Sequence, residues 1–457
     1  MKIIKISCWR LCATVVDFRF FISILIWLLA VSCGSDKTSA DRPTANVVKP
    51  TANVVKVVEV PGGFRLERNG KPYRIQGAGG TKYFDQLREA GGNSIRLWSA
   101  DYAEPLLDEA QRQGLTVMLG LWLEPDGKGV DYYDRTSVQT QLQRLRVQVL
   151  RFRNHPALLM WNVGNELDLT ESNPKMFMAI NEVAVMIHEL DPNHPVTTSI
   201  VYVVNTAPAL SHWAPAIDIL SINAYAPLLD VPQVLSKSGW KGPYIITEFG
   251  PKGYWEATKT PWDAPLEQTS AVKAAFTATR FRRTIIADSA RCLGSYIFFW
   301  GNKFEQNHTW FNIFTQTGEK TTMVDTLTYL WRGTRPANLA PTISRMELAG
   351  KRDVNFPRLK TNTDYFATFI ASDNENDPLT ADWELRPETP PEHTLDEGSA
   401  GEPLTGYLRV TATRGATLHT PRKPGAYRLF LVVHDGRGGA ATANIPFYCA
   451  DPKTRFD

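Results

Sequence analysis

The sequence predicts a (β/α)8 barrel followed by a smaller β-sandwich, and three observations support this fold class. The chain has 457 residues, which is too long for one ordinary domain. Between residues 74 and 300, short β-rich segments alternate with amphipathic helical segments, which is typical of parallel strands joined by helical crossovers. Beyond residue 337 the helical period stops, and Pro, Gly and Asp separate short alternating segments, as in a sandwich.

Eight strands and a preceding hairpin define the expected barrel domain, residues 57–336. The strands are expected at residues 74–77, 94–98, 116–122, 158–163, 196–201, 217–223, 244–247 and 294–300, with helices at 82–90, 104–113, 137–152 and 176–190. Their number and spacing match a (β/α)8 barrel. A doubly wound sheet fits less well, because no Gly-x-Gly-x-x-Gly motif follows a strand. Before them, Asn69-Gly70 between two β-rich runs predicts a hairpin turn.

The first 33 residues are expected to be a lipoprotein signal peptide. A basic lead precedes an apolar run from residue 20 to residue 31, which is short for a membrane span but typical of a signal-peptide core. Small residues then precede Cys33, and this order resembles the bacterial lipobox, in which the cysteine is lipidated. Residues 34–56 contain a duplicated polar heptad and predict a disordered tether. We therefore expect an exported protein, anchored by lipid to the bacterial cell envelope at the outer membrane or periplasmic face.

The charge of the chain argues against a nucleic-acid partner. The formal net charge is +3, and residues 1–33 hold four basic residues and one acidic residue, so the remainder is neutral. A neutral protein has no electrostatic attraction for nucleic acid or for an anionic surface. The membrane is thus expected to be contacted only through the lipid. No His or Cys cluster has the spacing of a metal site, and we expect neither a metal nor a cofactor.

The C-terminal domain is expected at residues 338–451. Its β-rich segments are 365–371, 380–385, 407–411, 425–434 and 441–447, and the whole resembles the immunoglobulin-like modules of bacterial surface enzymes. The acidic run 373–377 has enough oxygen atoms to hold calcium, although a solvated turn is the better explanation. No residue after Pro336 matches a catalytic role, so we expect a chain that ends near Ala337 to keep its turnover.

Two glutamates at the ends of apolar strands are the candidate catalytic residues. In a (β/α)8 barrel the active site lies at the carboxyl ends of the strands. Glu166 follows the fourth expected strand, and Glu248 ends the seventh. Glycoside cleavage needs a proton donor for the departing oxygen and, for retention, a carboxylate that attacks the anomeric carbon. A single Glu at a strand end is commonly a solvated charge, but two on one barrel mouth can meet both needs.

The segments around these glutamates resemble glycoside hydrolase family 2, the β-galactosidase and β-glucuronidase family. His155-Pro156, Trp161-Asn162 and Gly164-Asn165-Glu166 are similar to its acid/base segment, and Thr247-Glu248-Phe249-Gly250 is similar to its nucleophile segment. The family belongs to clan A of retaining glycosidases. The resemblance covers the barrel and implies that Glu166 is the acid/base and Glu248 the nucleophile. The two β-sandwich domains that precede the barrel in that family have no counterpart before it in this sequence.

The same resemblance implies further site residues. Arg96 would support the nucleophile, Tyr225 would hydrogen-bond it, Asn165 would contact the 2-hydroxyl of the sugar, and Trp300 would form an aromatic floor. Among the remaining residues, Trp98, Trp122 and Trp310 are candidate sugar platforms that core packing explains equally well, and His308 is a candidate to line the site. The pKa of Glu166 should be raised by the nearby negative nucleophile, so that it stays protonated.

The expected function is retaining hydrolysis of a β-linked oligo- or polysaccharide, of β-glucan or β-galactoside type, by a two-carboxylate double displacement. One alternative is a transglycosylase, in which a sugar acceptor intercepts the same covalent intermediate. A second alternative is a non-catalytic, glycan-binding surface lipoprotein. The presence of both glutamates together with Asn165 and Tyr225 argues against this second alternative.

Overall fold

The computed structural model describes residues 53–169, 173–201, 203–390, 402–411 and 415–451. The predicted signal peptide, the predicted lipidation site Cys33 and nearly all of the predicted tether lie outside these residues. The last two residues of that tether instead open β1 (Val55–Val60), which pairs with β2 (Gly63–Arg68), and β2 pairs with β3 (Lys71–Pro72). Asn69 and Gly70 link β2 to β3 with positive φ angles of 52° and 74°, so the predicted hairpin turn is confirmed.

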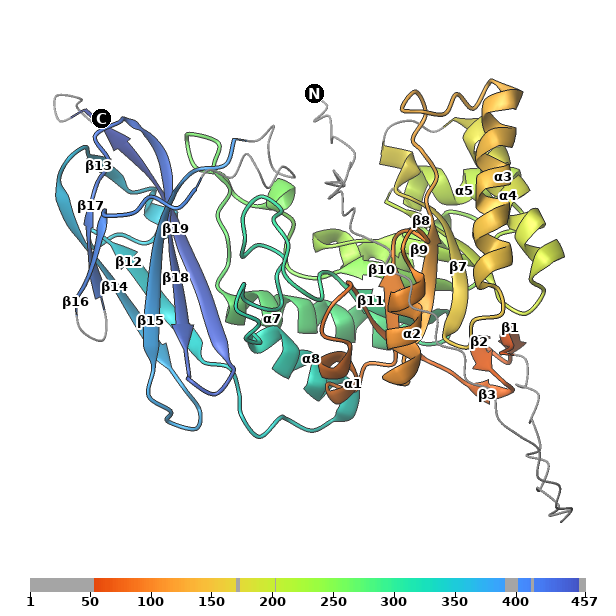
Figure 1. Cartoon of the computed structure of the whole chain (residues 1–457), viewed down its shortest axis with the longest axis horizontal. Coiled ribbons are helices and arrows are strands. Elements are labelled where there is room, and N and C mark those ends of the chain that lie inside the picture. The colour runs from red at the N-terminus through yellow and green to blue at the C-terminus, as the bar shows by residue number, and fades with distance from the viewer. Residues whose placement is uncertain (1–52, 170–172, 202, 391–401, 412–414, 452–457) are drawn as a thin grey trace, which may run out of the picture. The chain divides into compact units, whose positions relative to one another are not determined.

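Eight parallel strands form a closed barrel (Figure 1). They are β4 (Ile75–Gly79), β5 (Ser94–Leu97), β6 (Thr116–Leu121), β7 (Leu158–Asn165), β8 (Val196–Ile200), β9 (Ile219–Asn223), β10 (Tyr244–Phe249) and β11 (Cys292–Ile297). β11 pairs with β4 and closes the ring. Every expected strand overlaps one of these, so the predicted (β/α)8 barrel is confirmed.

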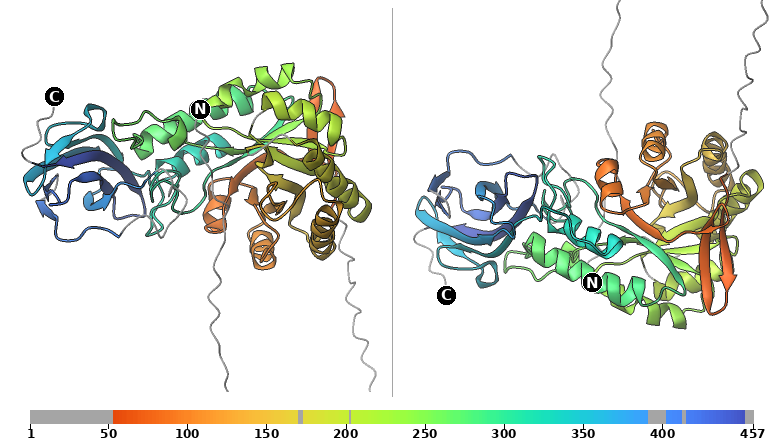
Figure 2. Two further views of the ribbon diagram at one scale, coloured as in Figure 1. Left: turned by 90° about the horizontal axis from the view of Figure 1, so that it is seen from above. Right: turned by 90° about the horizontal axis from the view of Figure 1, so that it is seen from below.

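Helices surround the barrel strands (Figure 2). They are α1 (Phe84–Glu89), α2 (Glu104–Arg112), α3 (Arg135–Phe152), α4 (Pro174–Leu190), α5 (Val203–Trp213), α6 (Val231–Lys237), α7 (Ser270–Arg280) and α8 (Thr322–Arg332). Short helical turns are η1 (Leu167–Leu169), η2 (Ala226–Asp230), η3 (Tyr254–Glu256), the π-helical η4 (Phe281–Ile286) and η5 (Asp353–Asn355). Asp134 begins α3 as its N-cap, since its carboxylate accepts the backbone N–H groups of Thr136 and Ser137.

The N-terminal hairpin closes one end of the barrel. Val55 and Leu66 of the hairpin share a buried apolar cluster with barrel residues that include Met118, Met160 and Ile245. Because this end of the barrel is filled by apolar side chains, a polar site must lie at the other end, where the strands reach their carboxyl termini.

The C-terminal residues form two four-stranded sheets. One has the order β12 (Thr342–Leu348), β14 (Asp364–Ser372), β17 (Gly415–His419) and β16 (Leu408–Thr411); the other has the order β13 (Arg358–Lys360), β19 (Ala440–Ala450), β18 (Gly425–His434) and β15 (Thr380–Pro387). Side chains of both sheets share one buried apolar cluster. All five expected strands are present, whereas β12, β13 and β17 were not expected.

The acidic run at 373–377 forms a turn. Oδ1 of Asp373 accepts the backbone N–H groups of Glu375 and Asp377, each at 2.9 Å. Within the described ranges, His, Cys, Asp and Glu side chains do not gather in groups of three or more suited to a metal ion. Nor does any helix in that part of the chain have the length and apolar character to cross a membrane.

Candidate active site

Both candidate glutamates lie at the carboxyl end of the barrel. β7 ends at Asn165, Glu166 follows it, and Glu248 lies one residue before the end of β10. Glu166 has a φ of 52°, in the left-handed region that side-chain-bearing residues rarely adopt, and its backbone N–H donates to the carbonyl of Ser199 at 2.9 Å. Gly164 also has a positive φ of 74°. The strand therefore ends in a fixed turn that carries Glu166.

Three donors hold the carboxylate of Glu248. Oε1 accepts from Nη1 of Arg96 at 2.6 Å and from Nε1 of Trp98 at 3.0 Å, and Oε2 accepts from the hydroxyl of Tyr225 at 3.0 Å. The residue is only 6% exposed. Charge-assisted bonds of this kind stabilise the carboxylate form and fix its direction. The structure thus places Arg96, Trp98 and Tyr225 directly on Glu248, with Trp98 as a hydrogen-bond donor rather than as a platform alone.

The buried guanidinium of Arg96 binds side chains on three other barrel strands. It lies on β5, is fully buried, and its Nη2 donates to Oδ1 of Asn165 at 2.6 Å and to Oγ of Ser199 at 3.2 Å. Since its Nη1 pairs with Glu248, one guanidinium group fixes both the nucleophile candidate and the residue before Glu166. An uncharged side chain at this position would leave a buried carboxylate without its partner.

Glu166 lies in an environment that favours its neutral form. Burial is the main cause, and the negative charge of Glu248 adds to it; together they raise the pKa of Glu166 to about 8. The predicted direction is therefore confirmed, although the sequence suggested only the second cause. Nδ2 of Asn223 donates to Oε1 of Glu166 at 2.7 Å, and Oδ1 of Asn223 accepts from the hydroxyl of Thr247. This second bond orients the amide so that its N–H group faces Glu166.

Asn223 is a site residue that the sequence reading missed. It is the last residue of β9 and lies two residues before the predicted Tyr225. The signal was available, because a polar side chain that ends an apolar barrel strand points to the site end of the barrel.

An aromatic wall packs against Trp98 and Tyr225, two of the residues that donate to Glu248. The ring of Phe298 meets Trp98 edge-on at 5.9 Å and Tyr225 at 6.1 Å between centroids. Phe311 in turn contacts Phe298 at 5.2 Å and Tyr225 at 5.4 Å. Apolar rings next to a polar pair limit the access of water to Glu248 and strengthen the electrostatic interactions there.

Comparison with known proteins identifies relatives of the barrel. Residues 85–308 match the family described as glycosyl hydrolases family 2, TIM barrel domain. The barrel of this chain is thus similar to the TIM barrel domain of glycosyl hydrolases family 2. Among curated relatives, the β-glucuronidase of Chlorocebus aethiops is 31% identical over 150 residues, which are 32% of this chain and 21% of that protein. The β-glucuronidase of Homo sapiens is 30% identical over 148 residues, again 32% and 21% of the two chains.

Solved structures with similarity to this chain include two β-glucuronidases. The β-glucuronidase of Bacteroides uniformis has a TM-score of 0.47 and 14% identity, covering 87% of this chain and 48% of its own. That of Dictyoglomus thermophilum has a TM-score of 0.48 and 18% identity, covering 62% and 54%. The match spans about a fifth of the length of the curated relatives and about half of these structures.

Trp300 does not lie where the sequence suggested. It is fully buried, with its ring 5.2 Å from Phe314 and 6.4 Å from Trp331, and its Nε1 donates to the carbonyl of Tyr83. Phe298, two residues earlier, instead packs against Trp98 and Tyr225, two of the donors to Glu248. The reason is that β11 ends at Ile297, so the alternation of side chains along a strand does not extend to residue 300.

The other two tryptophan candidates, Trp310 and Trp122, differ in their exposure to solvent. Trp310 is 2% exposed, lies in the same cluster as Tyr225 and Phe298, and donates from Nε1 to the carbonyl of Lys252. It therefore supports the aromatic wall from behind and has no free face for a sugar. Trp122 follows β6 at the site end of the barrel, is partly exposed and stays a candidate platform.

His308 faces the C-terminal sheets instead of lining the site. Its ring lies 4.4 Å from that of Phe430 on β18, and its Nε2 is 3.6 Å from Glu384 on β15. Burial lowers the pKa of His308, which favours the neutral imidazole. The prediction that His308 lines the site is therefore wrong, because contacts with a distant segment determine its direction.

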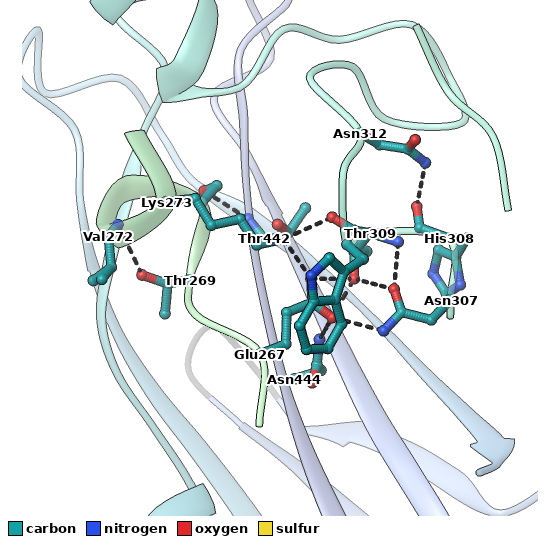
Figure 3. Close-up of polar contacts among 12 residues, drawn as sticks. Glu267, Thr269, Val272, Lys273, Asn307, His308, Thr309, Asn312, Thr442 and Asn444 are labelled. Atoms are coloured by element: carbon teal, nitrogen blue, oxygen red, sulfur yellow. Dashed lines mark hydrogen bonds and ion pairs between the residues drawn. The ribbon is translucent and has the colours of Figure 1, made fainter. Parts of the chain in front are cut away.

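A buried polar cluster ties the loop after β11 to the C-terminal sheets, as Figure 3 shows. The carboxylate of Glu267 accepts from Nδ2 of Asn307 at 2.7 Å, from Nδ2 of Asn444 at 2.7 Å and from the hydroxyl of Thr309 at 2.8 Å. Lys273 pairs with the same carboxylate and donates to the carbonyl of Thr309 at 2.7 Å. The loop that continues to Trp310 and Phe311 is thus anchored from both sides.

This cluster revises the expectation that the C-terminal residues are dispensable. Arg428 on β18 is 1% exposed; it donates to Oδ1 of Asn444 at 2.7 Å and to the carbonyl of Pro265 at 2.8 Å, and it pairs with Glu388. A chain that ends near Ala337 would lose Asn444 and Arg428 and expose Glu267 to water. We therefore expect such a chain to lose part of the support of the aromatic wall.

Proposed function

We propose that this chain is a retaining β-glycoside hydrolase, with Glu248 as nucleophile and Glu166 as acid/base. The observation that carries the proposal is that two neighbouring carboxyl groups, those of Glu248 and Glu166, lie in different environments. Three donors hold the carboxyl group of Glu248 in one orientation, whereas burial and the charge of Glu248 raise the pKa of Glu166 to about 8. A pair of titratable groups whose environments differ in this way is typical of an acid and a nucleophile acting together.

Each step of the reaction has a residue to perform it. Glu166 donates its proton to the glycosidic oxygen while Glu248 attacks the anomeric carbon, so the glycosidic bond breaks and an ester to Glu248 forms. Glu166, now a carboxylate, removes a proton from water, and that water attacks the same carbon and releases Glu248. Arg96 and Tyr225 orient the attacking carboxylate, and Asn223 holds Glu166. Asn165 is proposed to contact the 2-hydroxyl of the sugar.

The proposed substrate is a β-linked oligo- or polysaccharide of β-glucan or β-galactoside type. A β-glucuronide is the second candidate, because the curated relatives with about 30% identity are named β-glucuronidases. A panel of 4-nitrophenyl β-glycosides of glucose, galactose and glucuronic acid separates these candidates, since each reports on one sugar at the cleavage point.

Covalent trapping tests the mechanism. In a 2-deoxy-2-fluoro β-glycoside, the fluorine slows both steps. A dinitrophenol leaving group speeds only the first step, so the ester to the enzyme should accumulate. Peptide mass spectrometry should then find the fluoro sugar on the peptide that contains Glu248. For catalysis by direct attack, the two carboxyl groups should also lie about 5–5.5 Å apart.

The stereochemical outcome provides the control for this experiment. NMR of the first-formed product should show the β-anomer. An α-anomer, or a label on Glu166, would overturn the roles proposed here. Full loss of labelling in a Glu248→Gln variant that is still folded would exclude attachment elsewhere on the surface.

We further propose that residues 1–33 are a lipoprotein signal peptide, that Cys33 carries the lipid, and that the enzyme is held at the bacterial cell envelope. The basic lead, the apolar run and the small residues before Cys33 support this proposal. Metabolic labelling with a radioactive fatty acid should mark the wild-type chain and not a Cys33→Ala variant. We also propose that the two C-terminal sheets, which share one apolar cluster, form an immunoglobulin-like sandwich.

A further inference from the structure

We propose that the ring of Trp255 is a stacking platform for a second sugar residue of the substrate, next to the sugar at the cleavage point. This inference rests on the proposed function and adds to it a binding subsite for oligosaccharides. Trp255 lies in η3, the short turn after β10, and is 46% exposed.

The ring lies one side chain away from the nucleophile candidate. It meets Tyr225 edge-on with 5.4 Å between centroids, and the hydroxyl of Tyr225 donates to Glu248 at 3.0 Å. It also lies 6.0 Å from Phe311 of the aromatic wall. One edge of Trp255 therefore belongs to the wall of the site, while much of its surface is open to solvent.

The turn that carries Trp255 is fixed in place. The carboxylate of Glu256 accepts the backbone N–H of Gly253 at 2.9 Å and that of Ala226 at 3.2 Å, and Ala226 directly follows Tyr225. The indole lies so close over Gly253 that a Cβ there would be 2.5 Å from it. Tyr254 supports the ring at 4.8 Å. An exposed ring held this firmly loses little conformational freedom on binding a ligand.

The chemistry of such a surface suits a pyranose. One face of the sugar presents C–H groups, and an indole buries a large apolar area while leaving the hydroxyl groups at the rim in water. Scattered exposed aromatics are common and need no function. Trp213, which is 38% exposed at the C-terminal end of α5, is such a residue, and it lies at the opposite end of the barrel from the carboxylates. It provides a matched tryptophan control.

Kinetics on two substrates of the same sugar test the inference. A β-glycosyl fluoride fills only the cleavage point, whereas a β-linked tetrasaccharide also occupies neighbouring subsites. Trp255→Ala should lower kcat/KM on the tetrasaccharide roughly tenfold, mainly through KM, and should affect the fluoride clearly less. Trp255→Phe should recover part of the loss, and Trp213→Ala should change neither substrate.

Two results would overturn the inference. Equal losses on both substrates would show that Trp255 acts only by supporting Tyr225, and no loss on the tetrasaccharide would show that it binds no second sugar. Binding is measured independently by tryptophan fluorescence in a Glu248→Gln background, where β-linked tetrasaccharides of glucose, galactose and glucuronic acid should lose affinity with Trp255→Ala. If no glycosyl fluoride reacts with the wild type, the proposed function fails, while the fluorescence titration still decides whether Trp255 binds a sugar.

Discussion

Glu248→Gln should abolish turnover on every β-glycoside, with a loss of about 10⁴-fold or more, because it removes the carboxylate that attacks the anomeric carbon. The substitution should be tolerated by the fold. The amide oxygen can still accept from Arg96 and Trp98, and the amide N–H group can donate to the hydroxyl of Tyr225, which turns to accept. Rates on aryl β-glycosides and on oligosaccharides give the measurement.

The melting temperature gives the control for Glu248→Gln, and it should stay close to that of the wild type. Glu248→Ala is the poorer variant, because it would leave the buried guanidinium of Arg96 without its partner. Residual turnover within tenfold of the wild type in a folded Glu248→Gln variant would contradict the assignment of the nucleophile.

Glu166→Ala should cause a loss that depends on the leaving group. Substrates with poor leaving groups, such as oligosaccharides, need protonation of the departing oxygen and should lose about 10²–10⁴-fold. Dinitrophenyl glycosides depart without a proton and should lose far less in the first step. Azide should then restore turnover by attacking the intermediate, and the product should be the β-glycosyl azide. Equal losses on good and poor leaving groups would contradict the role of Glu166.

The pH profile supplies a second readout of Glu166. An acid must hold its proton in the free enzyme, so kcat/KM on a poor leaving group should fall as pH rises through the pKa of about 8. The direction follows because a higher pH removes the proton that Glu166 has to donate. In Glu166→Ala this alkaline limb should disappear, whereas a limb that persists would belong to another group.

The barrel and its two glutamates could be predicted because the physical signals are local. Buried parallel strands are short apolar runs, and Glu166 and Glu248 are charges placed where such runs end. The pKa direction of Glu166 followed from placing two carboxyl groups on one barrel mouth. Its main cause, burial, depends on how the surrounding side chains pack, and this cannot be obtained from spacing alone.

Other residues depend on contacts that are remote in sequence. Phe298 and Trp300 both follow β11, and only the backbone hydrogen bonds beyond the strand decide which of them faces the site. The backbone N–H of Phe298 donates to the carbonyl of Phe249, and that of Trp300 donates to the carbonyl of Gly79. The direction of His308 is set by a ring on β18. Trp255 gave no signal beyond being aromatic, because its place depends on how Glu256 binds the backbone next to Tyr225.

The Glu267 cluster has a consequence for how the molecule unfolds. In this cluster the charged Glu267 and Lys273 of the barrel lie beside Asn444 of β19 and Arg428 of β18. All four side chains are buried. The bonds of this cluster that cross from the sheets to the barrel include those from Asn444 to Glu267 and from Arg428 to the carbonyl of Pro265, and a hydrogen bond to a charged group contributes about 1.5–3 kcal/mol. Separation of the sheets from the barrel would therefore remove a donor from Glu267 and expose the Glu267–Lys273 pair to water. The two parts should lose their structure in one cooperative transition, and a sandwich exchanged from another protein would have to bring an amide to the position of Asn444.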